Sequence, residues 1–155
     1  MIIKQNWRRQ EKRDMVVLID TNVIMDFMMK REPHAEDAIR IINLCNSKKL
    51  TGYIAAHTIS NLFYILRKDF SVLQRKEMLT ALCGIFGISG IDRSKIMAAL
   101  DNQDFTDFED CLQMECASEI GAEYIITRNI SDFLNSRISV MEPRDFLEMI
   151  DAGTE

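Results

Sequence analysis

The chain has 155 residues, of which 47% are hydrophobic and 28% are charged, and its formal net charge is -5 at pH 7. This length predicts one domain with a sizeable core, and the apolar content excludes an intrinsically disordered chain. No apolar run approaches the roughly 18 residues that a membrane span needs, and no secretory signal is recognisable. We therefore expect a globular protein without membrane association. The acidic balance argues against wrapping nucleic acid by bulk positive charge, but leaves room for a local basic strip.

The four cysteines (Cys45, Cys83, Cys111 and Cys116) form no CxxC pair and lie far in sequence from both histidines. A zinc site or a disulfide framework is therefore not expected. Free cysteines usually pack as small buried hydrophobes, so we predict four buried thiols on helix faces. Such thiols persist in a reducing compartment, which predicts a cytoplasmic protein.

Residues 1–14 are polar and basic, and the composition changes abruptly at Met15. We predict a leader over 1–14 and a single domain over 15–151. The first element of that domain is the apolar run 15–19, rich in β-branched residues, which is typical of a strand buried on both faces. It stops at Asp20-Thr21-Asn22, residues that favour turns and helix caps, and a helical pattern follows.

The remaining elements alternate in the same way along the chain. Further strands are expected at 53–56, 88–91, 124–127 and 138–140, and helices from about 33 to 45, 57–66, 72–86, 96–100, 107–120 and 143–150. Strands that alternate with helices predict an α/β fold, with a mainly parallel central sheet of four to five strands and helices on both faces. In such sheets the strand carboxyl ends share one edge, where ligands bind.

Carboxylates and carboxamides from four chain segments are expected at this edge. They are Asp20 after the first strand, Asn61 early in the helix after the second, the group Asp104, Asp107, Glu109 and Asp110 around one helix start, and Asn129 and Asp132 with Arg128 after the fourth predicted strand. Asp107 and Asp110 are three residues apart, so one helix can present both on the same side. Asp110 also borders the apolar stripe of its helix, which turns it toward the sheet edge.

Clustered carboxylates repel one another unless a cation compensates them. Oxygen ligands suit a hard divalent ion such as Mg²⁺ or Mn²⁺. Such ions hydrolyse phosphodiesters by activating water and stabilising the charge that develops on oxygen, without a Ser, Cys or His nucleophile. An acidic-edge metal site is therefore one hypothesis.

Each of these residues also has a structural explanation when it is taken alone. Asp20 can simply cap the next helix, and the helix dipole favours acids such as Asp107 and Glu109 in a first turn. His57 is more often a capping or packing residue than a ligand, and Arg128 can be an ordinary loop cation. From the residues alone, the metal site and the purely structural alternative both stay open.

Three segments together resemble the PIN-domain ribonucleases, including the VapC-like toxins of bacterial toxin–antitoxin pairs. They are residues 16–26 (VVLIDTNVIMD), 107–113 (DFEDCLQ) and 121–133 (GAEYIITRNISDF), and the resemblance extends from about Met15 to Pro143. It implies a PIN-like three-layer α/β domain with a Mg²⁺- or Mn²⁺-dependent endoribonuclease site. It also implies RNA as substrate, a cognate antitoxin as partner and a homodimer.

The resemblance assigns roles residue by residue. Asp20 and Asp110 would be the principal metal ligands, with Asp107 or Asp132 assisting, and Asn61 and Asp107 would orient water. The loop residues beside these acids are the candidates for contacting substrate: Thr21, Asn22, Thr127, Arg128 (toward phosphate) and Asn129.

The sequence departs from the family pattern at two acidic positions. Asn61 stands where the family usually has glutamate, and Asn129 stands at the fourth acidic position. A neutral carboxamide can hydrogen-bond a metal-bound water, but it attracts a cation less strongly and cannot act as a base. One ion held by Asp20 and Asp110 is therefore a better expectation than two.

Two rival functions follow from these features. A PIN-like module that binds RNA or protein without efficient catalysis would explain Asn61. A phosphate-accepting regulatory domain with Asp20 as acceptor is less consistent, because it would need an acidic pair after the first strand and a lysine near the last. Positive charge for RNA is available at Lys48, Lys49, Arg67 and Lys68, although helix dipoles also explain cations at such helix ends.

Overall fold

The computed structural model describes residues 14–153, so the predicted basic leader lies outside the described residues except for Asp14. The strands are β1 (Val16–Ile19), β2 (Thr51–Ala55), β3 (Gly87–Ser89), β4 (Tyr124–Ile126) and β5 (Ser139–Met141). The helices are α1 (Thr21–Met29), α2 (Ala35–Asn46), α3 (Ala56–Ile65), α4 (Val72–Ile85), α5 (Arg93–Asp101), α6 (Phe108–Glu119) and α7 (Pro143–Ala152), with short 3₁₀ helices η1 (Leu66–Lys68) and η2 (Ile130–Phe133).

The strands form one five-stranded sheet in the order β3-β2-β1-β4-β5, and every pair is parallel. The predicted α/β fold with a parallel central sheet is therefore confirmed. β1 lies in the middle of the sheet, between β2 and β4, although β4 follows it in the chain only after six α-helices and two strands. The carboxyl ends of all five strands lie along one edge, as the sequence predicts.

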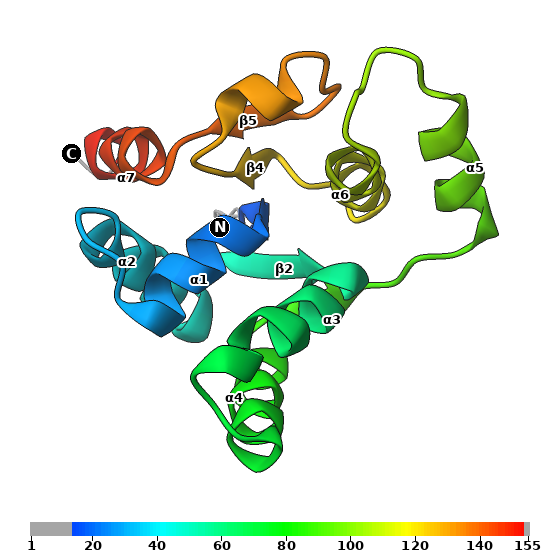
Figure 1. The fold of residues 1–155 in the computed structure, drawn as a ribbon. Coiled ribbons are helices and arrows are strands. Elements are labelled where there is room, and N and C mark those ends of the chain that lie inside the picture. Colours follow the sequence, from blue (N-terminus) through cyan, green and yellow to red (C-terminus); the bar gives the residue numbers. More distant parts are fainter. Residues whose placement is uncertain (1–13, 154–155) are drawn as a thin grey trace, which may run out of the picture.

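Helices cover both faces of the sheet (Figure 1), because successive side chains of a strand point to opposite sides. Val17 and Ile19 of β1 pack into a cluster with residues of α1, α2 and α7. Leu18 points to the other face and packs in a second cluster, which is built mainly on α6. The three-layer arrangement thus follows from the continuous apolar sequence of β1.

The pair of helices α3 and α4, joined by η1, extends away from the other helices in Figure 1. Ser71 starts α4 with a capping box, in which its hydroxyl accepts from the Gln74 amide and the Gln74 side chain accepts from the Ser71 amide. Arg75 ties the pair together by donating to the Phe63 carbonyl at 2.7 Å. The Arg75 contact therefore links the start of α4 to the end of α3.

Several element bounds differ from the sequence predictions. The fifth helix begins at Arg93 and not near Ile96, because the Asp92 side chain caps it by accepting from the Lys95 amide. The second helix begins at Ala35 and not at Pro33, because the His34 amide closes a turn on the Arg31 carbonyl (3.0 Å) before the helix starts. Cys45, Cys111 and Cys116 are buried free thiols as predicted, but Cys83 lies on the exposed side of α4. Within residues 14–153, no helix is both long and apolar enough to cross a membrane.

Candidate active site

Asp20 stands at the carboxyl end of β1 and caps the start of α1. Only 6% of the residue is exposed. One carboxylate oxygen, Oδ1, accepts from the Thr21 amide at 2.7 Å and from Gln113 Nε2 at 2.6 Å. The other, Oδ2, accepts from the Thr127 hydroxyl at 2.7 Å. Three donors from three chain segments therefore fix this carboxylate, and Oδ2 keeps a lone pair for another ligand.

Asp110 faces Asp20 from the first turn of α6. The preceding cap residue, Asp107, accepts a hydrogen bond from the Asp110 amide at 2.9 Å, which starts the helix at the sheet edge. Burial raises the pKa of the Asp110 carboxyl to about 7, and the charges of the neighbouring acids Asp107, Asp20, Asp132 and Glu109 act in the same direction. This edge thus holds more negative charge than the surrounding protein compensates.

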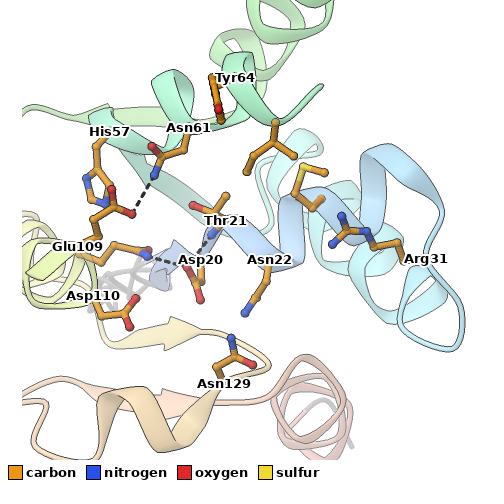
Figure 2. A pocket seen from close by; sticks show the side chains of 13 residues that line it. Asp20, Thr21, Asn22, Arg31, His57, Asn61, Tyr64, Glu109, Asp110 and Asn129 are labelled. Atoms are coloured by element: carbon orange, nitrogen blue, oxygen red, sulfur yellow. Dashed lines mark hydrogen bonds between the residues drawn. The ribbon is translucent and has the colours of Figure 1, made fainter. Parts of the chain in front are cut away.

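Both carboxylates line one cavity of about 400 Å³ at the carboxyl edge of the sheet (Figure 2). Of the sequence-predicted site residues, the cavity is lined by Asp20, Thr21, Asn22, Asn61, Asp110 and Asn129. These residues come from α1, α3, α6 and the loop after β4, so the predicted convergence of separate segments is observed. Asp107 and Asp132 are exposed outside this lining, and their charges reach Asp110 from there.

Thr127 and Arg128 do not line this cavity in the structure. Thr127 is buried, and its hydroxyl donates a hydrogen bond to Asp20. The Arg128 guanidinium makes an ion pair with Asp26, with Nη2 and Oδ1 3.1 Å apart, and lies in a separate hollow beside α2 and α7. Asp26 is fully buried, so Arg128 neutralises a buried charge where the sequence had suggested a phosphate contact.

Asn61, the residue at the position where the family usually has glutamate, is paired with a carboxylate of another helix. Its side-chain amide donates to Glu109 Oε2 at 3.1 Å, and both residues line the cavity (Figure 2). A negative charge is therefore present on the α3 side of the cavity, although α6 supplies it.

The sequence prediction of the site did not include four further polar lining residues, Arg31, His57, Tyr64 and Gln113. The apolar Met25 and Ile65 and the acid Glu109 complete the lining. Gln113 follows Asp110 by three residues, so the helical spacing could have placed it on the same side. Only 3% of Gln113 is exposed, and its Oε1 has no hydrogen-bond partner within residues 14–153. Burial lowers the pKa of His57, although the negative charges of Glu109 and Asp20 act to raise it. The lowered pKa favours a neutral imidazole.

The donor set of the cavity fits a divalent cation that retains water. Within residues 14–153, no three His, Cys, Asp or Glu side chains converge closely enough to hold an ion by themselves. Mg²⁺, however, is commonly held by one or two carboxylates, with water and substrate phosphate completing its shell. Asp20 and Asp110 supply those two carboxylates, and the raised pKa of Asp110 marks the place where a cation would be stabilised.

The sequence model of the PIN domain matches residues 16–131, which is most of the chain. The chain therefore belongs to the PIN-domain family, whose members are generally nucleases that use a divalent metal ion. A comparison with curated protein sequences gave no match.

Solved structures with the same fold come from bacterial toxin–antitoxin complexes. A toxin–antitoxin complex from Klebsiella pneumoniae gives a TM-score of 0.65 at 22% identity, covering 82% of this chain and 97% of that chain. VapBC2 from Rickettsia felis, bound to a DNA fragment from its promoter, gives 0.63 at 16% identity over 83% and 98% of the two chains. VapBC-1 from nontypeable Haemophilus influenzae gives 0.62 at 18% identity over 84% and 99%. At these identities the likeness establishes the fold.

Proposed function

We propose that this protein is a Mg²⁺- or Mn²⁺-dependent endoribonuclease and the toxin of a toxin–antitoxin pair. The observation that carries the proposal is the cavity in which Asp20 and Asp110 face each other at the carboxyl edge of β1. Membership of the PIN-domain family supports hydrolysis of a phosphodiester at that place.

In this mechanism Asp20 and Asp110 would hold the ion, and the exposed Asp132 and Asp107 add negative potential from outside the cavity. When bound there, such an ion supplies activated water and compensates the charge that develops on the phosphodiester oxygens. Gln113 and Thr127 keep the Asp20 carboxylate in one orientation by donating to its two oxygens. Asp110, whose pKa is raised to about 7 by burial in the metal-free protein, would hold the ion as a carboxylate.

Water is oriented from the opposite wall of the cavity by the pair Asn61 and Glu109. Glu109 provides an anionic acceptor there, which compensates for the neutral side chain of Asn61. Thr21, Asn22 and Asn129 line the same cavity as the acidic residues, and their side chains can form hydrogen bonds with substrate.

The partner assignments rest on the structural neighbours, which are complexes of a toxin with an antitoxin. We propose an antitoxin for this chain as well, and a reducing cytoplasm, which suits the free thiols of residues 14–153. The homodimer stays a prediction. Three aromatic residues on and near α3, Phe63, Tyr64 and Phe70, are candidates for its interface. Phe63 and Phe70 pack partly buried against the core, and Tyr64 is exposed.

A second candidate function is a binding module with weakened catalysis. The observation that favours it is Asn61, because the glutamate that the family usually carries on α3 is missing. This alternative keeps the cavity and the ion and predicts binding of RNA without hydrolysis.

The deciding experiment measures cleavage of a mixed RNA pool with Mn²⁺, Mg²⁺ or EDTA. Wild type, Asp20→Asn and Asp110→Asn are purified identically, with Glu148→Gln, an exposed acid on α7, as the matched control. Metal-dependent cleavage in wild type and Glu148→Gln, lost in both site variants, supports the nuclease. Equal cleavage in all four proteins indicates contamination and removes the support. An inactive wild type whose melting temperature still rises with Mn²⁺, unlike that of the site variants, favours the binding module.

A further inference from the structure

Most of the buried polar atoms that lack a hydrogen-bond partner belong to residues that line the acidic cavity. Among residues 14–153, these atoms are Nδ1 and Nε2 of His57, Oε1 of Gln113 and the hydroxyl of Ser89, and of these three residues only Ser89 is not part of the cavity wall. Buried polar groups in folded proteins almost always have a partner, and an exception calls for an explanation such as a bound ion or water. These atoms therefore point to a ligand at this cavity.

The free atom of Gln113 is its oxygen. Nε2 donates to Asp20 Oδ1 at 2.6 Å, and the reverse orientation of the carboxamide would bring two oxygen acceptors together. Oε1 is therefore the side without a donor, on a residue that is only 3% exposed. An unpaired buried acceptor destabilises the folded protein, so a partner from outside the chain would be favoured at Oε1.

Gln113 is linked to both carboxylates of the proposed ion site. It bonds Asp20 directly, and it follows Asp110 by three residues on α6, so one side of this helix can present both side chains. No three His, Cys, Asp or Glu side chains converge on one point in the described part of the chain, so a third protein ligand has to be of another type. A carboxamide oxygen is such a ligand, because carboxylate, carbonyl and water oxygens together suit Mg²⁺ and Mn²⁺.

A cation accounts for this oxygen better than another hydrogen-bond donor of the protein does. The charged groups on this side of the cavity are the acids Asp20, Glu109 and Asp110, whereas Arg31 lies on the side away from Asp110 (Figure 2). An oxygen acceptor placed among carboxylates adds to their mutual repulsion. A divalent cation relieves that repulsion and satisfies Oε1 at the same time.

We propose that Gln113 Oε1 is a third oxygen ligand of the divalent ion, beside Asp20 and Asp110. The proposal rests on the proposed metal-dependent function, and it adds a ligand that is not among those implied by the resemblance to PIN domains. One carboxamide then has two roles, because Nε2 orients Asp20 and Oε1 contacts the ion. The neutral oxygen of Gln113 compensates in part for Asn61 and Asn129, which supply no charge.

The first measurement tests for this contact in the wild-type protein. Protein labelled with ¹³C at the side-chain carbonyl of glutamine is loaded with an equimolar amount of Mn²⁺, and pulsed electron–nuclear double resonance detects coupling between Mn²⁺ and ¹³C. A ligating carbonyl should give a resolved ¹³C coupling, and this coupling should disappear in labelled Gln113→Met. Bound Mn²⁺ without a ¹³C coupling in wild type overturns the proposal, because water or a rearranged side chain would then satisfy Oε1.

The second measurement compares Gln113 with Thr127, which also donates to Asp20. Thr127→Val removes one donor from Asp20, as Gln113→Met does, but it leaves Oε1 in place. In calorimetric titrations Mn²⁺ affinity should fall about 10-fold in Thr127→Val and about 100-fold in Gln113→Met, the two ends of the range for groups that support a metal site. The exposed-acid control Glu148→Gln should bind Mn²⁺ like wild type. Equal losses in Thr127→Val and Gln113→Met overturn the proposal, because Gln113 would then act only by orienting Asp20.

Failure of this proposal is distinguishable from failure of the nuclease function. Mn²⁺ that binds through Asp20 and supports cleavage, but shows no coupling to glutamine, removes the third ligand and keeps the nuclease. Coupling to Gln113 without cleavage of RNA under any metal keeps the ligand and removes the nuclease. A wild type that binds no Mn²⁺ overturns both.

Discussion

Asn61 of α3 donates a hydrogen bond to Glu109 of α6 at 3.1 Å, across a sequence separation of 48 residues. The neutral amide and the carboxylate therefore act on the cavity as one unit. The negative charge that the resemblance to PIN domains predicts on α3 is supplied in this protein by Glu109 of α6.

The first prediction exchanges these two side chains. Glu109→Gln should lower both RNA cleavage and Mn²⁺ affinity by about 10- to 100-fold, the usual effect of losing a group that supports a metal site. Asn61→Glu alone places two carboxylates side by side and should lower the melting temperature in EDTA. The double variant Asn61→Glu/Glu109→Gln again has one carboxylate and one amide in the cavity wall. It should therefore recover most of the cleavage and Mn²⁺ affinity lost in Glu109→Gln and most of the melting temperature lost in Asn61→Glu.

Cleavage rate and the Mn²⁺-induced rise in melting temperature are measured for all four proteins. Additive losses in the double variant would show that the two side chains act independently. Full activity in Glu109→Gln would mean that the carboxylate has no part in the reaction.

The second prediction concerns the stability of the metal-free protein as a function of pH. The pKa of Asp110 is raised from 3.8 to about 7, because the folded protein favours the protonated carboxyl. The stability gained from the protonated carboxyl is complete below about pH 4 and is lost as the pH rises through about 7. Asp110→Asn removes this dependence. The two proteins should unfold alike near pH 4, and above pH 7 the variant should be more stable by about 1–2 kcal/mol, a value reduced because the carboxyl is only half-buried.

Thermal unfolding in EDTA, followed at several pH values, measures this difference, and each kcal/mol corresponds to about 2–4 °C at this chain length. The exposed-acid variant Glu148→Gln should follow wild type across the whole range. A variant that is less stable than wild type at high pH would contradict the excess of negative charge at this edge.

The third prediction separates the two possible roles of Arg128. Since its partner Asp26 is fully buried, Arg128→Ala should lower the free energy of unfolding by about 3–5 kcal/mol through the unpaired charge. Replacing both partners, as in Asp26→Leu/Arg128→Met, should recover most of that loss and bind RNA like wild type. Restored stability with clearly weakened RNA binding would instead assign Arg128 to a phosphate. Urea unfolding and anisotropy measure the two quantities.

The fourth prediction concerns Gln113, which donates to Asp20 at 2.6 Å. Gln113→Met loses a hydrogen bond to a charged group, about 1.5–3 kcal/mol, but also removes the unpartnered Oε1, so the net loss of stability should be only about 1 kcal/mol. Mn²⁺ affinity should fall about 10- to 100-fold, because Asp20 is no longer held in one orientation. Calorimetric titration with Mn²⁺ measures this loss. Unchanged affinity would limit Gln113 to a packing role.

Much of the fold was predictable because its signals are local. The apolar run of β1 and its stop at Asp20 predicted a central parallel strand and the edge at which the site lies. Asp110 was predictable from its position beside the apolar stripe of α6. Small errors arose where a turn competes with a helix, as at Pro33, since that choice depends on hydrogen bonds a pattern does not contain.

The partners of the polar side chains were not predictable in the same way. Arg128 is neutralised by Asp26, which precedes it by 102 residues, and nothing in either local sequence indicates that pairing. Arg31 and Tyr64 line the same cavity only because α1 packs against α3, so this part of the cavity wall is a property of the tertiary structure. Asn61 suggested a missing charge, and only the hydrogen bond between α3 and α6 reveals the Glu109 carboxylate beside it.

The position of β4 next to β1 has a consequence for the time at which the acidic centre can form. Thr127, which fixes the Asp20 carboxylate, is separated from it by 107 residues, and Asp110 and Gln113 also arrive late in the chain. A ribosome making this protein therefore exposes β1 long before its second neighbour exists, and contacts of such long range close slowly. The acidic centre is therefore incomplete in the nascent chain, and chemistry at this edge can begin only after nearly the whole domain has emerged and β4 has docked.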